Sequence, residues 1–197
     1  MATGTWPPLY RIHTPRVVLR CFELADAVAL HTLLRQHHEE LGSWLDLPKV
    51  PDSIEAAATR ITRFRRRFDA GQRFSYAALV DGELAGALAV EPIAAKGLLL
   101  GGWVRPTLAA RGLASEALAA ACHVGFTRGA RYVELRIRTD NEPSQVLARR
   151  LGFRHEATLA GRVLSRGRVY DEMIWTLPSG PIDAPTVCAF DAIGRAA

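Results

Sequence analysis

Apolar residues in this chain recur with two different spacings, which predict two kinds of structural element. Short runs rich in β-branched and aromatic residues, either alternating with polar residues or continuously apolar, predict strands. Longer runs in which apolar residues return every three or four positions predict helices. The predicted strands are residues 16–20, 74–80, 84–90, 98–104, 132–138, 153–157 and 170–177. The predicted helices are residues 24–41, a segment that opens at Asp52, residues 112–127 and residues 143–151.

Local signals set several of these boundaries. Gly42 is expected to end the first helix, because glycine is common just past a helix end. Asp52 has a glutamate three residues later, the pattern of a capping box, and is expected to be the N-cap of the second helix. Asp81-Gly82 between two apolar runs is a strong hairpin signal, and Pro143 suits the first turn of a short helix.

The predicted order is a strand, two helices, three antiparallel strands, a helix, a strand, a helix and two strands. Residues 98–104 are apolar on both faces, which places this strand in the interior of the sheet. A mixed sheet with helices packed on it belongs to the α/β (α+β) class.

The segment from Trp103 to Leu118 joins one of these strands to a long apolar helix through a turn of small residues. Backbone N–H groups at the start of a helix have no partner within the helix and lie at the positive end of its dipole. A turn that gathers several of them binds a phosphate or pyrophosphate. Gly112 removes a Cβ that would hold such an anion away, and Ala109, Ala110 and Ala114 keep the turn narrow.

The composition fits one globular domain with a substantial core. The chain has 197 residues, of which 49% are hydrophobic and 23% charged, an ordinary balance for a globular protein. No apolar run approaches the ~20 residues that cross a bilayer, and Met1–Tyr10 lacks the pattern of a signal peptide. We therefore expect no membrane association and a cytoplasmic location.

The cysteines and the charge narrow the chemistry. Cys21, Cys122 and Cys188 are odd in number and far apart, so they predict neither a disulfide framework nor a metal site. The net charge of +5 permits attraction to an acidic partner such as a phosphorylated coenzyme. The basic residues are not interleaved with aromatic ones as in a stacking platform, so nucleic acid is not expected as a partner.

Two further motifs follow the small-residue turn, namely Thr139–Ser144 and Leu151-Gly152-Phe153. Together with the turn they resemble the Gcn5-related N-acetyltransferases (GNAT), and most closely the branch that includes the ribosomal-protein serine/alanine N-terminal acetyltransferases. The features of that branch seen here are Thr14–Arg20, Trp44-Leu45, Gly102–Val104, Asn141 with Ser144, Leu151–Phe153, and Gly167 with Asp171.

The resemblance implies the GNAT fold, a mixed and mostly antiparallel sheet of about seven strands with flanking helices. In this fold the sheet splays open between its fourth and fifth strands. The resemblance covers residues 14–177, which we expect to form the acetyltransferase domain. Residues 1–13 would then be an N-terminal extension and residues 178–197 a C-terminal tail.

The resemblance also implies an acyl-CoA, typically acetyl-CoA, as co-substrate, with no metal. The pyrophosphate would lie on Ala109–Ala114 and the pantetheine along Gly102–Arg105, with an N–H near Trp103 or Val104 polarising the acetyl carbonyl. The expected cofactor-binding residues are Trp103, Val104, Arg105, Ala109, Ala110, Arg111, Gly112, Leu113, Ala114, Asn141 and Ser144. Ala109 stands where the family usually has Gln or Arg, which removes one side-chain contact.

Asn141 and Ser144 are expected to act as a pair. By resemblance, Ser144 protonates the CoA thiolate, directly or by orienting water, and Asn141 holds the cofactor and the strand end. The group that accepts the proton of the amine is left open. Glu91, Glu134 and Glu156 are candidates, and a water-mediated route without a single base is an alternative.

The sequence thus predicts an enzyme, an N-acetyltransferase that moves an acetyl or related acyl group from acyl-CoA to a primary amine. A protein N-terminal α-amine is the first acceptor hypothesis, and a small-molecule amine or antibiotic is the alternative. A cationic antibiotic would need a carboxylate-lined cleft, for which Glu39, Glu40, Asp46 and Glu91 are candidates. A non-catalytic CoA-binding sensor or scaffold is the alternative from another class. A homodimer is one assembly that the resemblance allows.

Overall fold

The computed structural model of the chain describes residues 6, 8–44, 51–191 and 194–196, without the side chains of residues 43 and 44. Its strands are β1 (Arg11–His13), β2 (Val18–Cys21), β3 (Phe74–Val80), β4 (Glu83–Ile93), β5 (Gly97–Val104), β6 (Tyr132–Arg138), β7 (Arg154–Ser165), β8 (Arg168–Pro178) and β9 (Cys188–Phe190). Its helices are α1 (Ala27–Gln36), α2 (His38–Trp44), α3 (Ile54–Asp69), α4 (Leu113–Thr127) and α5 (Glu142–Arg150). Short 3-10 turns lie at η1 (Leu24–Asp26), η2 (Ala94–Lys96) and η3 (Pro106–Leu108). Leu45 of the expected Trp44-Leu45 motif lies outside the described residues.

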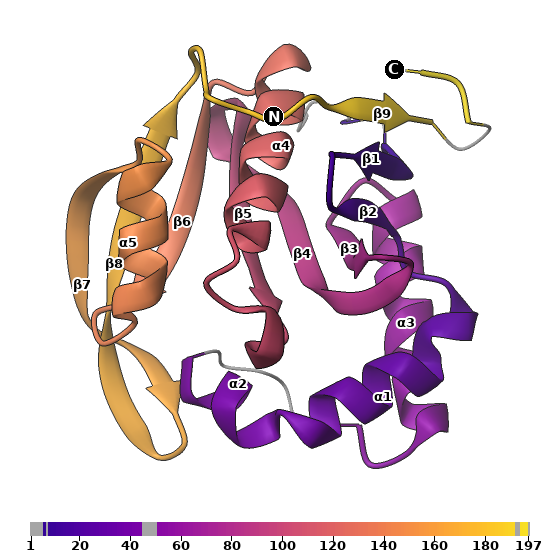
Figure 1. The fold of residues 1–197 in the computed structure, drawn as a ribbon. Coiled ribbons are helices and arrows are strands. Elements are labelled where there is room, and N and C mark those ends of the chain that lie inside the picture. Colours follow the sequence, from indigo (N-terminus) through magenta and orange to yellow (C-terminus); the bar gives the residue numbers. More distant parts are fainter. Residues whose placement is uncertain (1–5, 7, 45–50, 192–193, 197) are drawn as a thin grey trace.

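The strands form one nine-stranded sheet in the order β7-β8-β6-β5-β4-β3-β2-β1-β9 (Figure 1). Neighbouring strands are antiparallel except β5 and β6, which are parallel. The prediction of a mixed, mostly antiparallel sheet with flanking helices is confirmed. The sheet is wider than predicted because β1 and β9 extend one edge from segments expected to be an extension and a tail. Each has only three residues, too few for a periodic signal.

The first predicted helix is interrupted. After η1 and α1, His37 has φ −117° and ψ 21°, outside the helical region, and α2 then runs through Gly42 to its end. The expectation that Gly42 ends the helix is therefore wrong. A Cβ at Gly42 would collide with the guanidinium group of Arg166. The glycine thus makes room for the tip of the β7–β8 hairpin.

Turn chemistry explains three other boundaries. Ser53 rather than Asp52 is the N-cap of α3, because its hydroxyl accepts a hydrogen bond from the Ala56 N–H at 3.1 Å. The predicted Asp81-Gly82 turn is confirmed, with positive φ values of 52° and 80°. β7 and β8 run further than predicted, to a second turn of this kind at Arg166-Gly167, with φ values of 50° and 75°.

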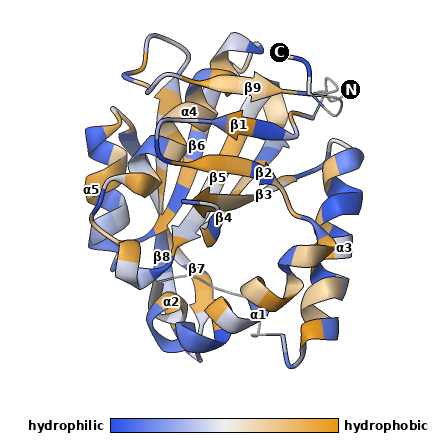
Figure 2. Cartoon of the chain, turned by 45° about the vertical axis from the view of Figure 1, so that its right-hand side comes forward, coloured by the Kyte–Doolittle hydropathy of each residue, from blue (hydrophilic) through white to orange (hydrophobic). Residues whose placement is uncertain are grey.

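Apolar clusters cover both faces of the sheet. Tyr76 and Ala77 are consecutive in β3 and therefore point to opposite faces. Tyr76 belongs to the cluster that includes α4 residues such as Leu118. Ala77 belongs to the cluster that includes Leu30 of α1 and Ile61 of α3. α3 accordingly carries both polar and apolar residues (Figure 2).

The tip of the β7–β8 hairpin lies beside α2 at one end of the sheet (Figure 1). Nη2 of Arg166 donates to the carbonyl oxygens of His38 and Glu39, at 3.3 and 3.4 Å. The β7–β8 hairpin and α2, which are far apart in the sequence, are thus joined by hydrogen bonds at this end of the sheet.

Candidate active site

β5 and β6 pair along only half of their length. Gly97–Leu100 lies opposite Tyr132–Leu135. In the ladders of the described strands, Gly101–Val104 pairs only with β4 and Arg136–Arg138 only with β8. The predicted splay between these two strands is therefore confirmed, and it opens at their carboxyl ends.

The separated half of β5 carries an exposed peptide edge. Along a strand, the N–H and C=O groups of one residue face the strand on one side, and those of the next residue face the other side. The Arg105 N–H donates to the Ala85 carbonyl oxygen at 2.7 Å, so the peptide groups of Trp103 also face β4. Those of Gly102 and Val104 face the opening. Of the two regions expected to supply an oxyanion donor, the geometry favours the N–H of Val104.

A cavity of about 250 Å³ lies in this opening. Most of its lining is apolar, and its polar lining residues are Arg136, Arg138, Asn141, Ser144 and Glu172. The expected cofactor-binding residues that line it are Trp103, Val104, Leu113, Ala114, Asn141 and Ser144. The cavity therefore joins the free edge of β5, the first turn of α4 and the start of α5.

The residues between η3 and α4 form the turn that is expected to bind a phosphate group. Ala110 and Gly112 have left-handed backbones, with φ values of 60° and 78°, and Ala109 is extended. Gly112 is the N-cap of α4, and no side chain caps this helix. The first N–H groups, beginning at Leu113, are therefore free of helical partners at the positive end of a 15-residue helix. This turn fits a diphosphate.

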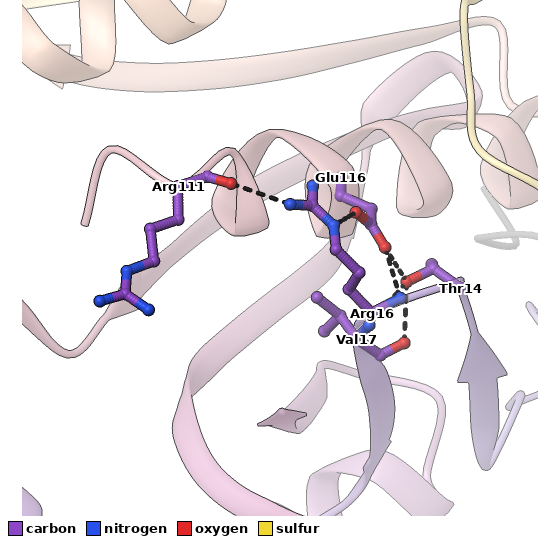
Figure 3. Close-up of polar contacts among 5 residues, drawn as sticks. All are labelled: Thr14, Arg16, Val17, Arg111 and Glu116. Atoms are coloured by element: carbon purple, nitrogen blue, oxygen red, sulfur yellow. Dashed lines mark hydrogen bonds and ion pairs between the residues drawn. The ribbon is translucent and has the colours of Figure 1, made fainter. Parts of the chain in front are cut away.

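Thr14 and Arg16, which precede β2, hold this turn from the side (Figure 3). Nε of Arg16 pairs with Oε2 of Glu116 at 2.6 Å. The Arg16 backbone N–H and the Thr14 hydroxyl both donate to Oε1 of Glu116, at 2.9 and 2.6 Å. Nη1 of Arg16 donates to the Arg111 carbonyl oxygen at 3.0 Å. The peptide that enters Gly112 is therefore anchored to another part of the chain.

The Glu116 side chain is only 8% exposed, whereas that of Arg16 is 53% exposed. Burial alone would raise the pKa of Glu116, but the hydrogen bonds from Thr14 and Arg16, with the charge of Arg16, hold that pKa below its ordinary value. The sequence analysis missed this contact. The signal in the sequence was Glu116 itself, a carboxylate in the first turn of an apolar helix. A carboxylate that is buried there requires a partner.

The remaining residues expected at the phosphates and the pantetheine lie outside the cavity lining. The Arg111 side chain is exposed and points away from Arg16 and Glu116 (Figure 3). Arg105 follows β5, with Nη1 3.6 Å from Oε2 of Glu83. The side chains of Arg105 and Arg111 are therefore not part of the cavity lining.

Asn141 and Ser144 come together at the start of α5. Asn141 is 7% exposed, and its Oδ1 accepts a hydrogen bond from the backbone N–H of Ser144 at 3.2 Å. Asn141 is thus the N-cap of α5. The cap uses the backbone of Ser144 and leaves its hydroxyl available to the cavity.

The structure describes all three carboxylates that are candidates for the base, namely Glu91, Glu134 and Glu156. None of the three lines the cavity. Glu91 on β4 accepts a hydrogen bond from Nη1 of Arg73 at 2.6 Å. Glu134 on β6 accepts one from Nε of Arg136 at 2.8 Å. Glu156 on β7 is exposed. The structure therefore does not bring these carboxylates to the Asn141–Ser144 pair.

Glu172 on β8 is the one carboxylate among the described lining residues, and the sequence analysis did not select it. It lies opposite Arg138 in the β6–β8 ladder. Arg138 binds both carboxylate oxygens of Asp140, at 3.0 and 2.6 Å, and its guanidinium lies 3.8 Å from the ring centre of Tyr170. Residues 170–177 were predicted as a strand, and a strand pattern alone does not show which of its two faces meets the opening.

In the described part of the chain, no cluster of His, Cys, Asp or Glu residues is able to hold a metal ion. The helices found there are all too short or too polar to cross a membrane.

An open parallel pair with a free peptide edge beside an uncapped helix start is an arrangement that fits an extended acyl-coenzyme. A family model described as Acetyltransferase (GNAT) domain matches residues 16–154. Since the match spans more than half of the 197 residues, the chain belongs to the GNAT family of acetyltransferases. No curated protein matched the sequence significantly.

Solved structures share this fold over most of the chain. RimL, described as a ribosomal L7/L12 alpha-N-protein acetyltransferase and solved with coenzyme A, has a TM-score of 0.78 at 25% identity, over 84% of this chain and 95% of that one. Mycobacterium smegmatis RimJ, solved with CoA-disulfide, has a TM-score of 0.79 at 23% identity, over 89% of both chains. The microcin C7 self-immunity acetyltransferase MccE, solved with acetyl-CoA and AMP, has a TM-score of 0.79 at 18% identity, over 83% and 93%. The last two likenesses show the fold alone.

Proposed function

We propose that this GNAT protein transfers an acetyl group from acetyl-CoA to the α-amine at the N-terminus of a protein or peptide. The observation that carries the proposal is the opening between β5 and β6. Around the cavity in this opening lie the free peptide groups of Gly102 and Val104, the first turn of α4 and the Asn141–Ser144 pair. A cytoplasmic setting belongs to the same proposal, supported by three cysteines that are all free thiols.

Each part of the opening has a role in binding the co-substrate. The N–H groups that follow Gly112 would bind the diphosphate. The peptide groups of Gly102 and Val104 would pair with the pantetheine amides as an added strand does. Because these contacts are made by the backbone, the short side chain of Ala109 weakens the site without removing it.

The reacting atoms would lie between Val104 and Ser144. The N–H of Val104 is oriented to stabilise negative charge on the acetyl oxygen as the amine attacks. The Ser144 hydroxyl would deliver a proton to the departing thiolate, directly or through water. Asn141 would hold Ser144 in place through the cap of α5.

The charged residues that line the cavity indicate which class of amine it can accept. Two arginines, Arg136 and Arg138, and one carboxylate, Glu172, line it. A polycationic antibiotic requires several carboxylates at its site. Glu39 and Glu40 lie on α2 outside the cavity lining, and Asp46 lies outside the described residues. A single amine on a peptide suits this cavity better, and the likeness to RimL supports a protein N-terminus as acceptor.

The test is turnover against a panel of amines, followed as free thiol released from acetyl-CoA. The panel contains serine- and alanine-initiated peptides, the same peptides with blocked N-termini, a polyamine and an aminoglycoside. We expect thiol release and a mass increase of one acetyl group only with the free peptide N-termini. Release with the polyamine or aminoglycoside alone would move the acceptor to the small-molecule class. Release no faster than hydrolysis with every amine, despite CoA binding, would instead indicate a sensor.

A further inference from the structure

The carboxylates near the opening differ in how they are paired. Glu91 and Glu134 each accept a hydrogen bond from an arginine, at 2.6 and 2.8 Å, and neither lines the cavity. Glu156 is exposed. The Glu172 side chain is half-buried, lines the cavity and makes neither a hydrogen bond nor an ion pair with any described residue. Among the described carboxylates, it is therefore the one that faces the cavity with a side chain that no arginine holds.

We propose that Glu172 accepts the proton that the attacking amine releases, an inference that rests on the proposed function. The β6–β8 ladder places Glu172 beside Arg138, the last residue of β6. That is the end at which β6 has separated from β5, so Glu172 shares one cavity with Val104 and Ser144. Base, oxyanion donor and acid thus come from three different elements around the same space.

Charged groups lie around Glu172 without forming a hydrogen bond or an ion pair with its side chain. Arg138 lies opposite on β6, and the charge of Glu172 also acts on Arg136 of the same strand. On β7 the opposite residue is the uncharged Leu159, with Arg162 in the adjoining irregular stretch. On β8 itself the nearest titratable group on the same face is Tyr170, whose ring is covered by Arg138. No second carboxylate of the described residues lines the cavity, so none competes there with Glu172 for the proton of the amine.

The amine nitrogen forms a bond to the acetyl carbon, and the bond from that carbon to sulfur breaks with its electron pair leaving on sulfur. The acceptor arrives as an ammonium ion, and Glu172 takes one proton from it and passes it to solvent, which leaves the neutral amine that attacks. The second proton, which the nitrogen loses after the new bond forms, goes to solvent. The thiolate takes a proton through Ser144, which solvent replaces. No oxidant or further reactant is needed.

The experiment measures kcat against pH for the wild type and for Glu172→Gln, with a serine- or alanine-initiated peptide as acceptor. We expect Glu172→Gln to lose about 100-fold in kcat at pH 7, the usual contribution of a positioned base. The deficit should shrink as the pH rises past the α-amine pKa of about 8, since the amine is then already neutral. Glu172→Asp should recover part of the loss at neutral pH.

The comparison variants are Glu134→Gln, as the competing base, and Asp183→Asn, an exposed carboxylate remote from the opening. Glu172→Gln that keeps wild-type kcat, or that loses the same factor at every pH, would overturn the inference. So would a pH-dependent loss in Glu134→Gln alone. Calorimetric CoA binding checks that Glu172→Gln is folded. A wild type that binds CoA but acetylates none of the peptides would overturn the proposed function itself, a separate result.

Discussion

Arg16 and Glu116 form a 2.6 Å ion pair between residues that are 100 positions apart in the sequence. The pair joins the segment before β2 to the first turn of α4. The same guanidinium also binds the Arg111 carbonyl oxygen at 3.0 Å. The turn proposed to bind the diphosphate is therefore held from outside its own sequence, and Arg16 is a positioning residue for it.

Arg16→Ala is expected to weaken CoA binding about tenfold while changing kcat little. The substitution removes the hydrogen bond to the Arg111 carbonyl, worth about 1 kcal/mol, and a positive charge close to the diphosphate. Titration calorimetry gives the Kd of CoA, and steady-state kinetics separate KM for acetyl-CoA from kcat.

The matched control for this prediction is Arg11→Ala, which removes an exposed arginine of β1. It removes the same net charge as Arg16→Ala but makes no contact with the turn before α4. It should therefore leave the Kd of CoA within about twofold of the wild type, because salt screens charges that lie far from the site. Equal weakening by both substitutions would show that only net charge matters and that the position of Arg16 does not.

Gly112→Ala is expected to destabilise the fold by about 1 kcal/mol and to weaken CoA binding. Gly112 has φ +78°, which costs an alanine about 1–2 kcal/mol. Its Cβ would also lie 3.4 Å from Nη2 of Arg16. Denaturant unfolding measures the loss of stability, and calorimetry measures the loss of CoA binding.

Gly180→Ala is the control for Gly112→Ala, because nothing lies within 4 Å of its added Cβ. An equally stable Gly112→Ala that binds CoA normally would refute the role assigned to this turn.

Glu116 should make stability depend on pH on the acid side. Its pKa is lower in the folded chain than its ordinary value, so its ionised form stabilises the fold above the unfolded-state pKa of about 4.3. That stabilisation is lost as the pH falls through the folded-state pKa. Glu116→Gln should therefore have a lower Tm at neutral pH and a smaller fall in Tm between about pH 6 and pH 3. Parallel Tm curves for the two proteins would contradict this expectation.

Substitutions at Asn141 and Ser144 should separate capping from catalysis. Asn141→Ala removes the cap of α5 and should cost about 1 kcal/mol of stability, whereas Asn141→Asp keeps an oxygen acceptor and should retain most of it. Ser144→Ala should leave the Tm unchanged, because the cap uses its backbone N–H. It should lower kcat by about 10- to 100-fold. A wild-type kcat in Ser144→Ala would assign thiolate protonation to water alone.

The sequence was sufficient for those parts of the fold and site that depend on local pattern. The seven longer strands follow from apolar runs, the Asp81-Gly82 turn from hairpin chemistry, and the phosphate turn from small residues before a buried helix. The pairing of Asn141 with Ser144 also follows from a local motif, since the cap spans three residues.

The features that the sequence did not reveal depend on contacts between distant segments. The Arg16–Glu116 pair requires β2 and α4 to be placed together, which no periodicity encodes. The position of Glu172 depends on the register of β6 with β8, because a strand pattern fixes two faces but not what each face meets. Gly42 was expected to end a helix, and its actual neighbour, Arg166, comes from a hairpin more than 100 residues away.

A structure of the protein with CoA tests the central claim most directly. We predict that the diphosphate lies on the N–H groups following Gly112, that the pantetheine amides pair with Gly102 and Val104, and that the sulfur lies near Ser144. A coenzyme bound elsewhere, or an opening between β5 and β6 that stays empty at saturating CoA, would contradict the account.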